Sequence, residues 1–307
     1  MPASVEFHEV RKSYGAQPVL RGVSFSVARG EIVGLLGPNG CGKTTTLRLI
    51  AGFLAPDSGE VRVCGERVGT ESLAVRKRIG YLPEKPPLYD ALKVRDYLDF
   101  VAAAKGIPSS QRRAALDAAM AGYALGPVAN KVIGTLSKGY RQRVGLAQAT
   151  LADPEVLLLD EATNGLDALQ IVEARALIRA GASGRAVIFC SHLMQEVAAL
   201  CDRVIVLHGG RPVELADASP TPRFELRLSG ISIEAAAQAL AGVAGASDIE
   251  CRADGEQIVV RCAGDTALVA DALARAATAH AQLLSLEVQR ASLEDRFIAA
   301  MKREAQA

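Results

Sequence analysis

One short stretch restricts what this chain can fold into more than any other. Residues 37–44 read Gly-Pro-Asn-Gly-Cys-Gly-Lys-Thr, which fits the pattern G-x-x-x-x-G-K-[ST]. They follow a continuous apolar run at residues 32–36 and precede a stretch with helical spacing that extends to about residue 53. A continuous apolar run is typical of a strand buried on both faces of a sheet. The order of strand, glycine-bearing loop and helix therefore predicts an α/β domain with a mostly parallel core sheet.

This loop has the composition needed to bind phosphate. The phosphates of ATP need several backbone N–H donors pointing inward, and glycines permit the turns with positive φ that arrange them. The following helix presents its positive end to the same anions. Lys43 would bridge the β- and γ-phosphates, and the hydroxyl of Thr44 would ligate Mg²⁺. A glycine-rich turn that binds nothing is the alternative, and the position between a strand and a helix disfavours it. The residues expected to contact the nucleotide here are Gly37, Pro38, Asn39, Gly40, Cys41, Gly42, Lys43, Thr44 and Thr45.

A second group of residues lies where another buried strand ends. Residues 156–159 form a continuous apolar run that leads directly to Asp160 and Glu161. The strand would place these carboxylates at its carboxyl edge, beside the phosphate-binding loop. Asp160 is expected to hold Mg²⁺, directly or through water, whereas Glu161 could orient the attacking water or accept its proton. Alone, the pattern would suit a strand that ends at a solvated acidic turn, but next to the loop the metal-binding interpretation is favoured.

The remaining periodicity extends the first domain. The apolar run at residues 186–190 and the segment at residues 203–207, which is apolar after Arg203, predict further core strands, and alternation over residues 5–10 and 19–27 predicts an antiparallel hairpin.

Helical spacing predicts a helical subdomain at about residues 88–152. It covers residues 90–127, with a break at Gly106-Ile107-Pro108, and resumes over residues 139–151. The whole domain is expected to span residues 1–216.

A second, smaller domain is expected at residues 224–307, after a turn at Gly209-Gly210-Arg211-Pro212 and a linker at residues 217–223. Its periodicity gives the split βαββαβ order of a ferredoxin-like α+β domain with a terminal helix. The expected elements are strand 224–229, helix 232–242, strands 246–252 and 256–262, helix 265–279, strand 282–289 and helix 291–303.

The bulk composition excludes several classes of protein. The formal net charge of +1 gives no broad basic surface, so no nucleic-acid partner is expected. The six cysteines are scattered without a CxxC pair, and no secretory segment opens the chain, which suggests reduced thiols in a cytoplasmic protein. The longest apolar runs have about five residues, whereas a membrane-spanning helix needs about twenty. A function at a membrane would therefore require another chain.

Residues 136–142, Leu-Ser-Lys-Gly-Tyr-Arg-Gln, are similar to the LSGGQ motif of ATP-binding cassette (ABC) ATPases. The resemblance covers roughly residues 4–214 and includes the order in which that family shows its elements: residues 37–44, residues 136–142, residues 156–161, Asp167 and His192. The variants Tyr-Leu-Pro-Glu, Leu-Ser-Lys-Gly-Tyr and Asn-Gly-Leu-Asp resemble the exporter branch, which includes drug-, polysaccharide- and gliding-motility-type subunits. Residues 291–297, Ala-Ser-Leu-Glu-Asp-Arg-Phe, are similar to a segment near the end of its members.

The resemblance implies a nucleotide enclosed between two cassettes, with the loop of one facing residues 136–142 of the other. The hydroxyl of Ser137, the N–H of Gly139 and the positive helix end suit a γ-phosphate that arrives from a second subunit. The same groups could also simply cap the helix.

Three more roles come only from the resemblance. Tyr14 would stack on adenine, His192 would sense the γ-phosphate and fix the water and the glutamate, and Asp167 would couple the two sites. Without it, Tyr14 would be a hairpin-end aromatic and His192 a structural histidine. The expected catalytic residues are Glu161, His192 and Lys43.

Several positions depart from the family pattern. Glu84 stands where a glutamine is common, and it could give an oxygen to the nucleotide-bound Mg²⁺ but adds charge and loses an amide donor. Tyr140 replaces the glutamine of LSGGQ, and Lys138 replaces a glycine. Lys138 could point toward phosphate or face solvent, and solvent is favoured. Cys41 could make ATP binding sensitive to thiol reagents or could be a tolerated small residue.

These features predict the ATP-binding and ATP-hydrolysing subunit of an ABC transporter, with ATP and Mg²⁺ as cofactors. Its partners would be a second copy of the cassette and separately encoded integral membrane permease subunits. The protein would then be cytoplasmic and peripheral on the inner face of the cell membrane. Its permease groove is expected around residues 84–89 and the helical subdomain. Leu88, Tyr89 and Leu92 fit an apolar docking surface there, and burial in the core explains these apolar residues equally well.

Two alternatives are less favoured. A soluble ABC ATPase that acts on DNA or ribosomes is disfavoured by the single cassette, the near-neutral charge and the absence of sustained heptads between Thr44 and Ser137. A mechanical binder without turnover is disfavoured because Glu161 and His192 are both present.

Overall fold

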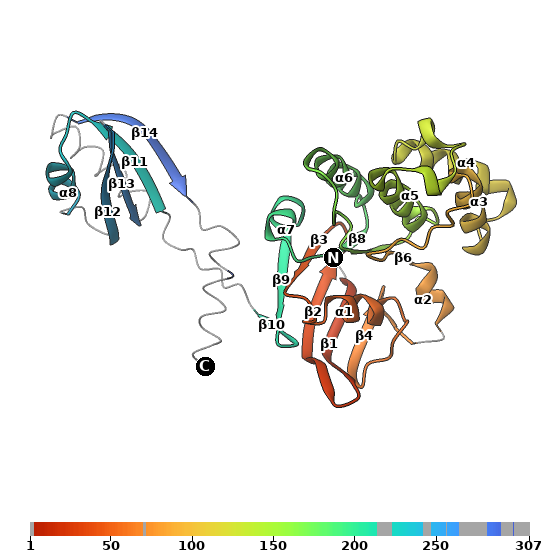
Figure 1. Cartoon of the computed structure of the whole chain (residues 1–307). Helices are drawn as coiled ribbons and strands as arrows, with labels where there is room; N and C mark the ends of the chain where they lie inside the picture. The colour runs from red at the N-terminus through yellow and green to blue at the C-terminus, as the bar shows by residue number, and fades with distance from the viewer. Residues whose placement is uncertain are drawn as a thin grey trace. The chain divides into compact units, whose positions relative to one another are not determined.

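The protein is described by a computed structural model that covers residues 3–69, 72–213, 223–241, 247–255, 257–263, 281–289 and 297. The chain separates into two compact units, Met1–Glu214 and Leu215–Ala307 (Figure 1). The expected linker at residues 217–223 lies almost wholly outside the described residues, so its conformation stays a prediction.

A six-stranded sheet forms the centre of the first unit. Its strands lie in the order β10 (Arg211–Val213), β9 (Arg203–His208), β3 (Ile32–Leu36), β8 (Ala186–Ser191), β7 (Val156–Asp160) and β6 (Ile79–Leu82). All neighbouring pairs are parallel except β9 with β10. Every residue of β3, β7 and β8 is buried, as the continuous apolar runs predict. The expectation of an α/β domain with a mostly parallel core sheet is confirmed.

The segment at residues 209–212 was predicted as a turn, and the structure corrects half of it. Gly209 and Gly210 form the turn with positive φ, but Arg211–Val213 is the edge strand β10. Pro212 pairs with Leu207 there. An edge position tolerates proline because a strand at the edge leaves one row of backbone groups unpaired.

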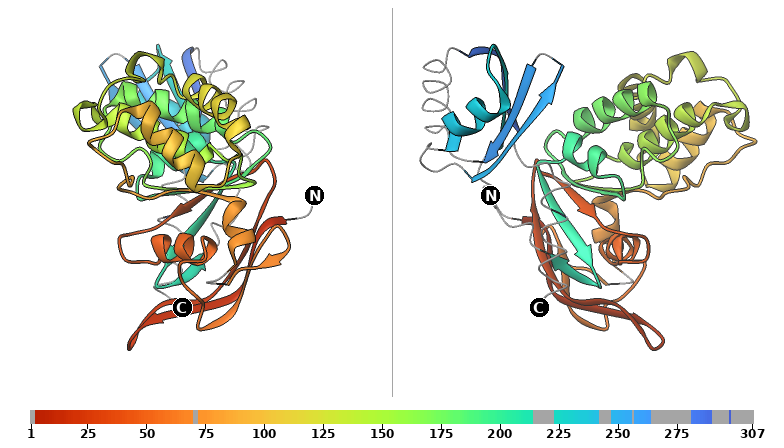
Figure 2. Two further views of the ribbon diagram at one scale, coloured as in Figure 1. Left: turned by 90° about the vertical axis from the view of Figure 1, so that its right-hand side faces the viewer. Right: turned by 60° about the vertical axis from the view of Figure 1, so that its left-hand side comes forward.

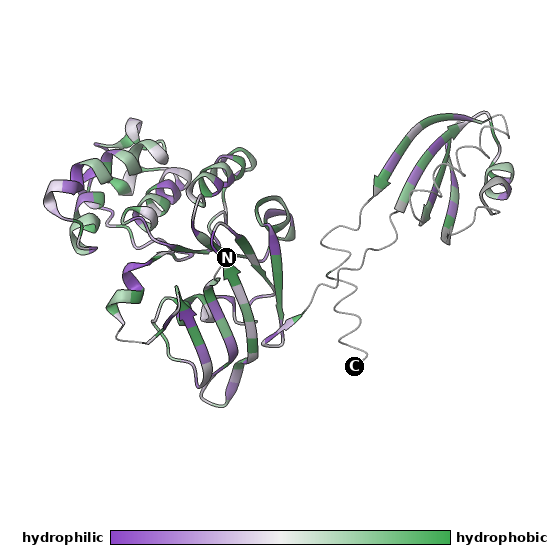
Figure 3. Ribbon diagram, turned by 180° about the vertical axis from the view of Figure 1, so that it is seen from behind, coloured by the Kyte–Doolittle hydropathy of each residue, from purple (hydrophilic) through white to green (hydrophobic). Residues whose placement is uncertain are grey.

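An antiparallel sheet packs beside the core. Its strand order is β2 (Gln17–Ala28), β1 (Ala3–Tyr14), β4 (Ser58–Val63) and β5 (Glu66–Arg67). Figure 3 shows hydrophobic and hydrophilic bands alternating along these strands, which is the pattern of a sheet with one buried face. Phe7 and Phe25 stack with their ring centroids 4.6 Å apart. The predicted hairpin is confirmed, although both strands are longer than the alternation suggested.

The helical part of the first unit stands apart from the antiparallel strands, as both views of Figure 2 show. It contains α3 (Val94–Ala104), α4 (Ser109–Gly122) and α5 (Lys138–Thr150), with short 3₁₀ turns at Gly126–Val128 and Ile133–Thr135. The break expected at Gly106-Ile107-Pro108 separates α3 from α4. The described residues of the first unit also form α1 (Lys43–Ile50), α2 (Leu73–Lys77), α6 (Ala168–Gly181) and α7 (Met194–Leu200) around the sheet.

The second unit contains a four-stranded antiparallel sheet in the order β12 (Ser247–Asp254), β13 (Gln257–Ala263), β11 (Arg223–Ser229) and β14 (Gln282–Gln289), with α8 (Ile233–Ala241) between β11 and β12. β13 is inserted between β11 and β12, so those two strands form a split βαβ unit. The expected helices at residues 265–279 and 291–303 lie outside the described residues. The ferredoxin-like assignment therefore stays a prediction.

The approach of α5 to β6 can be tested at Gly80. A Cβ there would lie 2.3 Å from the carbonyl oxygen of Ala149 and 2.9 Å from Cγ of Pro154. We expect Gly80→Ala to lower the free energy of unfolding by about 1–3 kcal/mol, because backbone atoms cannot move aside cheaply. Gly122→Ala is the matched control, since nothing lies within 4 Å of its Cβ position at the end of α4. It should be neutral or stabilise by up to about 1 kcal/mol. Urea denaturation followed by circular dichroism measures both, and equal midpoints would contradict the close packing.

Candidate functional site

The loop at residues 37–44 takes the conformation that its glycines allow. Gly40 and Gly42 have φ values of 82° and 112°, which non-glycine residues rarely adopt. Gly42 occupies the N-cap position of α1, where no side chain accepts a hydrogen bond from the first turn. That turn also holds no acidic residue. The N–H groups of that turn are therefore available to an anion at the positive end of the helix dipole.

Lys43 is folded back against this loop. It is 7% exposed, and its Nζ donates to the carbonyl oxygens of Gly37 at 2.7 Å and Pro38 at 3.2 Å. These two bonds hold the ammonium group against the loop, where a phosphate could become its counter-ion.

The base of the loop is closely packed, which explains two of its residues. A Cβ at Gly37 would lie 2.4 Å from the carbonyl oxygen of Leu207 and 2.6 Å from Sγ of Cys41. Cys41 is itself buried, and burial raises the pKa of its thiol. A buried thiol with a raised pKa has little reactive thiolate. The geometry favours Cys41 as a small packing residue over a thiol-sensitive one.

Oxygen ligands gather at the carboxyl edge of the core sheet. Asp160 ends β7, and the hydroxyl of Thr44, the second residue of α1, lies near its carboxylate. Burial raises the pKa of Asp160, the nearby Thr44 hydroxyl opposes this, and the charges of Glu161 and Glu84 raise it further. Glu84 follows β6, the neighbour of β7, and its side chain is exposed.

These oxygens suit Mg²⁺ held partly by phosphate. Among the described residues, no three His, Cys, Asp or Glu side chains are grouped to hold a metal ion. Mg²⁺ at nucleotide sites typically takes one or two protein oxygens and completes its shell with phosphates and water. The Thr44 hydroxyl and the nearby Asp160 carboxylate, beside a loop that can bind phosphate, fit that requirement.

Glu161 and His192 face each other across two neighbouring strands. Asp160 pairs with Cys190 in the β7–β8 ladder, and the residues just beyond this pair carry the two side chains. Nδ1 of His192 lies 2.8 Å from Oε2 of Glu161. The backbone of Glu161 has a φ of 51°, in the left-handed region that residues with a Cβ rarely adopt. The structure thus brings together two of the three expected catalytic side chains, those of Glu161 and His192.

The segment at residues 136–142 begins α5. Ser137 is its N-cap, and its Oγ accepts from the N–H of Tyr140 at 3.5 Å. The capping interpretation of Ser137 is thus observed, and it leaves phosphate binding open because both use the same geometry.

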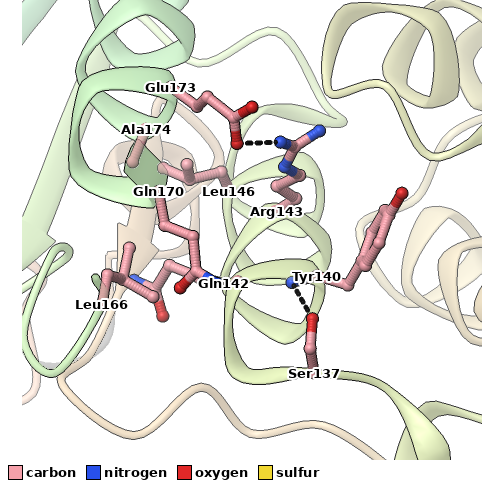
Figure 4. Close-up of a pocket in the computed structure, with 10 residues that line it drawn as sticks. Ser137, Tyr140, Gln142, Arg143, Leu146, Leu166, Gln170, Glu173 and Ala174 are labelled. Atoms are coloured by element: carbon pink, nitrogen blue, oxygen red, sulfur yellow. Dashed lines mark hydrogen bonds and ion pairs between the residues drawn. The ribbon is translucent and has the colours of Figure 1, made fainter. Parts of the chain in front are cut away.

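A cavity of about 230 Å³ lies between this end of α5 and α6, and Figure 4 shows the residues that line it. Arg143 and Glu173 form an ion pair at 2.6 Å on one side, and Gln142 and Gln170 lie on the other. The two helices lie close together at Gly139, since a Cβ there would be 3.2 Å from the side-chain amide carbon of Gln170.

The other expected site residues lie in simple local environments. Asp167 is the N-cap of α6, and its Oδ1 accepts from the N–H of Gln170 at 2.8 Å. Tyr14 ends β1 and is 46% exposed. Lys138 is exposed, as expected, but its Nζ lies against Gly165, where it would be 2.1 Å from an added Cβ.

One group of residues behind the site was not predicted from the sequence. Glu196 on α7 is buried, and its carboxylate accepts hydrogen bonds from the hydroxyls of Thr163 and Ser191. The signal in the sequence was faint: a glutamate four residues after His192, within a helix that the periodicity did not indicate.

Together, the loop, the acidic strand end and the apposed Glu161 and His192 define a nucleotide-binding protein of the P-loop class. The ABC transporter family model matches residues 20–164. The chain belongs to this family and is the ATP-binding subunit type of ABC transporter.

Similar proteins support that assignment along most of the chain. The Nod factor export ATP-binding protein I of Paraburkholderia xenovorans (strain LB400) is 39% identical over 71% of this chain and 72% of its own length. The linearmycin resistance ATP-binding protein LnrL of Bacillus subtilis (strain 168) is 30% identical over 96% of this chain and 97% of its own. The expected resemblance to exporter-type subunits is confirmed.

Solved structures agree on the fold. One described as the structure of an ATP-binding subunit of an ABC transporter has a TM-score of 0.62 and 30% identity, and the match covers 68% of this chain and 88% of that one. CbiO1 from Clostridium perfringens, described as part of the ABC transporter complex cbiONQ, has a TM-score of 0.65 and 27% identity, covering 70% and 88%.

Lys43 provides a direct test of the loop. We expect Lys43→Ala to weaken binding of a non-hydrolysable ATP analogue with Mg²⁺ by at least about thirtyfold, because loss of a buried charged partner costs about 2 kcal/mol or more. Lys77→Ala, which removes an exposed lysine of α2, should bind normally. Isothermal titration calorimetry measures both affinities, and equal values would remove Lys43 from the binding site.

Proposed function

We propose that this chain hydrolyses ATP and so powers transport through a separately encoded membrane permease. The observation that carries this proposal is the 2.8 Å contact between Glu161 and His192, beside Asp160 and the phosphate-binding loop. Glu161 is the general base that orients the attacking water and accepts its proton. His192 holds that carboxylate in place and reaches toward the γ-phosphate.

Lys43, Thr44 and the N–H groups of the loop bind and orient the phosphates, and Thr44 and Asp160 hold Mg²⁺. Bound Mg²⁺ neutralises charge on the β- and γ-phosphates. Glu84 extends the acidic edge toward the same metal. Tyr14, exposed at the end of β1, stacks on adenine.

The site is completed by a second copy of the cassette. Ser137, Gly139 and the positive end of α5 lie at an exposed helix start, where they can meet the γ-phosphate held by the loop of the partner copy. Asp167, at the start of α6, couples the two sites across this interface. ATP then closes the dimer, and hydrolysis reopens it.

The permease docks on the helical part of the first unit. Tyr89 and Phe100 are 51% and 49% exposed, and their ring centroids lie 5.4 Å apart. The two rings therefore form an exposed aromatic surface. Leu88 and Leu92 are partly buried beside them. No helix in the described part of the chain is long and apolar enough to span a bilayer. A permease bound to this surface would hold the subunit at the inner face of the cell membrane.

Export is the direction that the relatives favour. The names of two relatives refer to Nod factor export and to linearmycin resistance, and the match to the second extends over both units of this chain. The permease selects the substrate, and this subunit supplies the energy of ATP hydrolysis.

The catalytic assignment predicts the behaviour of Glu161→Gln. This variant should bind Mg·ATP as tightly as the wild type, lower turnover by about 10²–10⁴-fold, and accumulate an ATP-bound dimer. Phosphate-release assays and light scattering after size-exclusion chromatography measure the two effects. Glu60→Gln, which changes a carboxylate on β4, is the control and should leave both unchanged. Turnover at the wild-type rate in Glu161→Gln would exclude Glu161 as the base.

The docking surface predicts the behaviour of Tyr89→Ala. In the Glu161→Gln background with Mg·ATP, the intact protein should recover a polytopic membrane protein from native membranes. Tyr89→Ala should weaken that association by about thirtyfold, as loss of an aromatic anchor typically costs about 2 kcal/mol or more. Leu73→Ala, which removes a 69%-exposed side chain on α2, is the control. Equal recovery with Tyr89→Ala, or recovery of ribosomes or repair proteins instead, would contradict the assignment.

A further inference from the structure

A buried carboxylate lies behind the candidate site, and the proposed chemistry does not use it. Glu196, on α7, is 3% exposed. Its Oε2 accepts from the Thr163 hydroxyl in a short hydrogen bond and from the Ser191 hydroxyl at 3.1 Å. Its Oε1 has no hydrogen-bond partner among the described residues.

The charge of the buried Glu196 carboxylate depends on the two hydroxyls for its stabilisation. Burial of a charged group is costly unless hydrogen bonds or an opposite charge compensate it. Among the described residues, Glu196 forms no ion pair. The hydroxyls of Thr163 and Ser191 donate all the hydrogen bonds that its carboxylate accepts there. Both bonds end on the same oxygen atom, and a displacement of either hydroxyl therefore disturbs the bond to the other.

The two hydroxyls come from the loops that carry the proposed catalytic pair. Thr163 lies two residues after Glu161, in a turn closed by the N–H of Asn164, which donates to the carbonyl oxygen of Glu161 at 3.0 Å. Ser191 directly precedes His192. Its Oγ also accepts from the N–H of Leu193 at 3.0 Å, so His192 lies between two residues that this hydroxyl fixes.

The same connection reaches the segment that leads to Asp167. The N–H of Leu166 donates to the carbonyl oxygen of Thr163 at 3.3 Å, and all three polar members of the network are nearly inaccessible to solvent, with Thr163 at 1% and Ser191 at 0% exposure. A chain of short polar contacts in a dry interior responds as a unit, because no water can replace a broken bond.

We propose that Glu196 is a positioning residue, which sets the distance between Glu161 and His192 by tying Thr163 to Ser191 and so transmits displacements of residues 164–167 to His192. Glu196 does not touch the reacting atoms. The inference rests on the proposed hydrolysis, since the geometry that Glu196 controls is that of the base and its histidine. A carboxylate that merely stabilises the fold would affect turnover only through the amount of folded protein.

A matched pair of substitutions at Thr163 separates these roles. Thr163→Val keeps the shape and removes the hydroxyl, whereas Thr163→Ser keeps the hydroxyl and removes a buried methyl group. For Thr163→Val we expect kcat for ATP to fall by roughly ten- to a hundredfold, because small misplacements of catalytic groups have effects of that order. The KM for ATP should change less than about twofold, since the phosphate-binding loop is untouched. Thr163→Ser should retain most of the wild-type kcat.

A second measurement needs no turnover. Hydrogen exchange at the amide of Leu193 should accelerate by at least about tenfold in Thr163→Val and stay near the wild-type rate in Thr163→Ser, because loss of one bond to Glu196 releases Ser191 and the amide that it protects.

Two results would overturn the inference and leave the proposed hydrolysis intact. One is normal kcat together with unchanged exchange in Thr163→Val. The other is an equal decrease of kcat in both variants, in proportion to their loss of thermal stability. A wild-type protein that binds ATP but does not hydrolyse it would instead refute the proposed function, and the inference with it.

Discussion

The parallel pairing of β3, β7 and β8 is the constraint on which the whole site depends. Leu36 pairs with Ser191, and Asp160 pairs with Cys190, so three loops leave the sheet at one edge and at the same level. Residues far apart in sequence then meet there: the loop that starts at Gly37, the pair Asp160 and Glu161, and His192. A shift of one residue in either ladder would turn alternate side chains to the other face, and a shift in the β7–β8 ladder would separate Glu161 from His192.

Much of this arrangement follows from local sequence. The continuous apolar runs of β3, β7 and β8 identify strands buried on both faces, and a parallel sheet requires their carboxyl ends to share an edge. The site at that edge was therefore predictable from residues 37–44 and 156–161. Short or exposed elements were not predictable in the same way. β6 has only four residues and contains Gly80, α7 has seven residues, and β10 is an edge strand through Pro212. In each case tertiary contacts outweigh weak local preference.

The contact between Glu196, Thr163 and Ser191 shows another limit of prediction from sequence. Each residue is common in solvent-exposed positions, and nothing in their spacing indicates that they share one buried oxygen. The pairing of β7 with β8, together with the return of α7 over the sheet, creates the contact. Lys138 illustrates the same point, because its exposure was expected but its position against Gly165 depends on the turn before α6.

The backbone conformation of Glu161 lowers the stability of the fold. Its left-handed backbone is unfavourable for a residue with a Cβ by about 1–2 kcal/mol, a strain that glycine would relieve at once. Conformational stability and the proposed chemistry therefore make opposite demands on this single position. A laboratory selection for heat resistance alone would favour glycine there, and the most stable descendants of this chain would still bind a nucleotide after losing the group proposed to hydrolyse it.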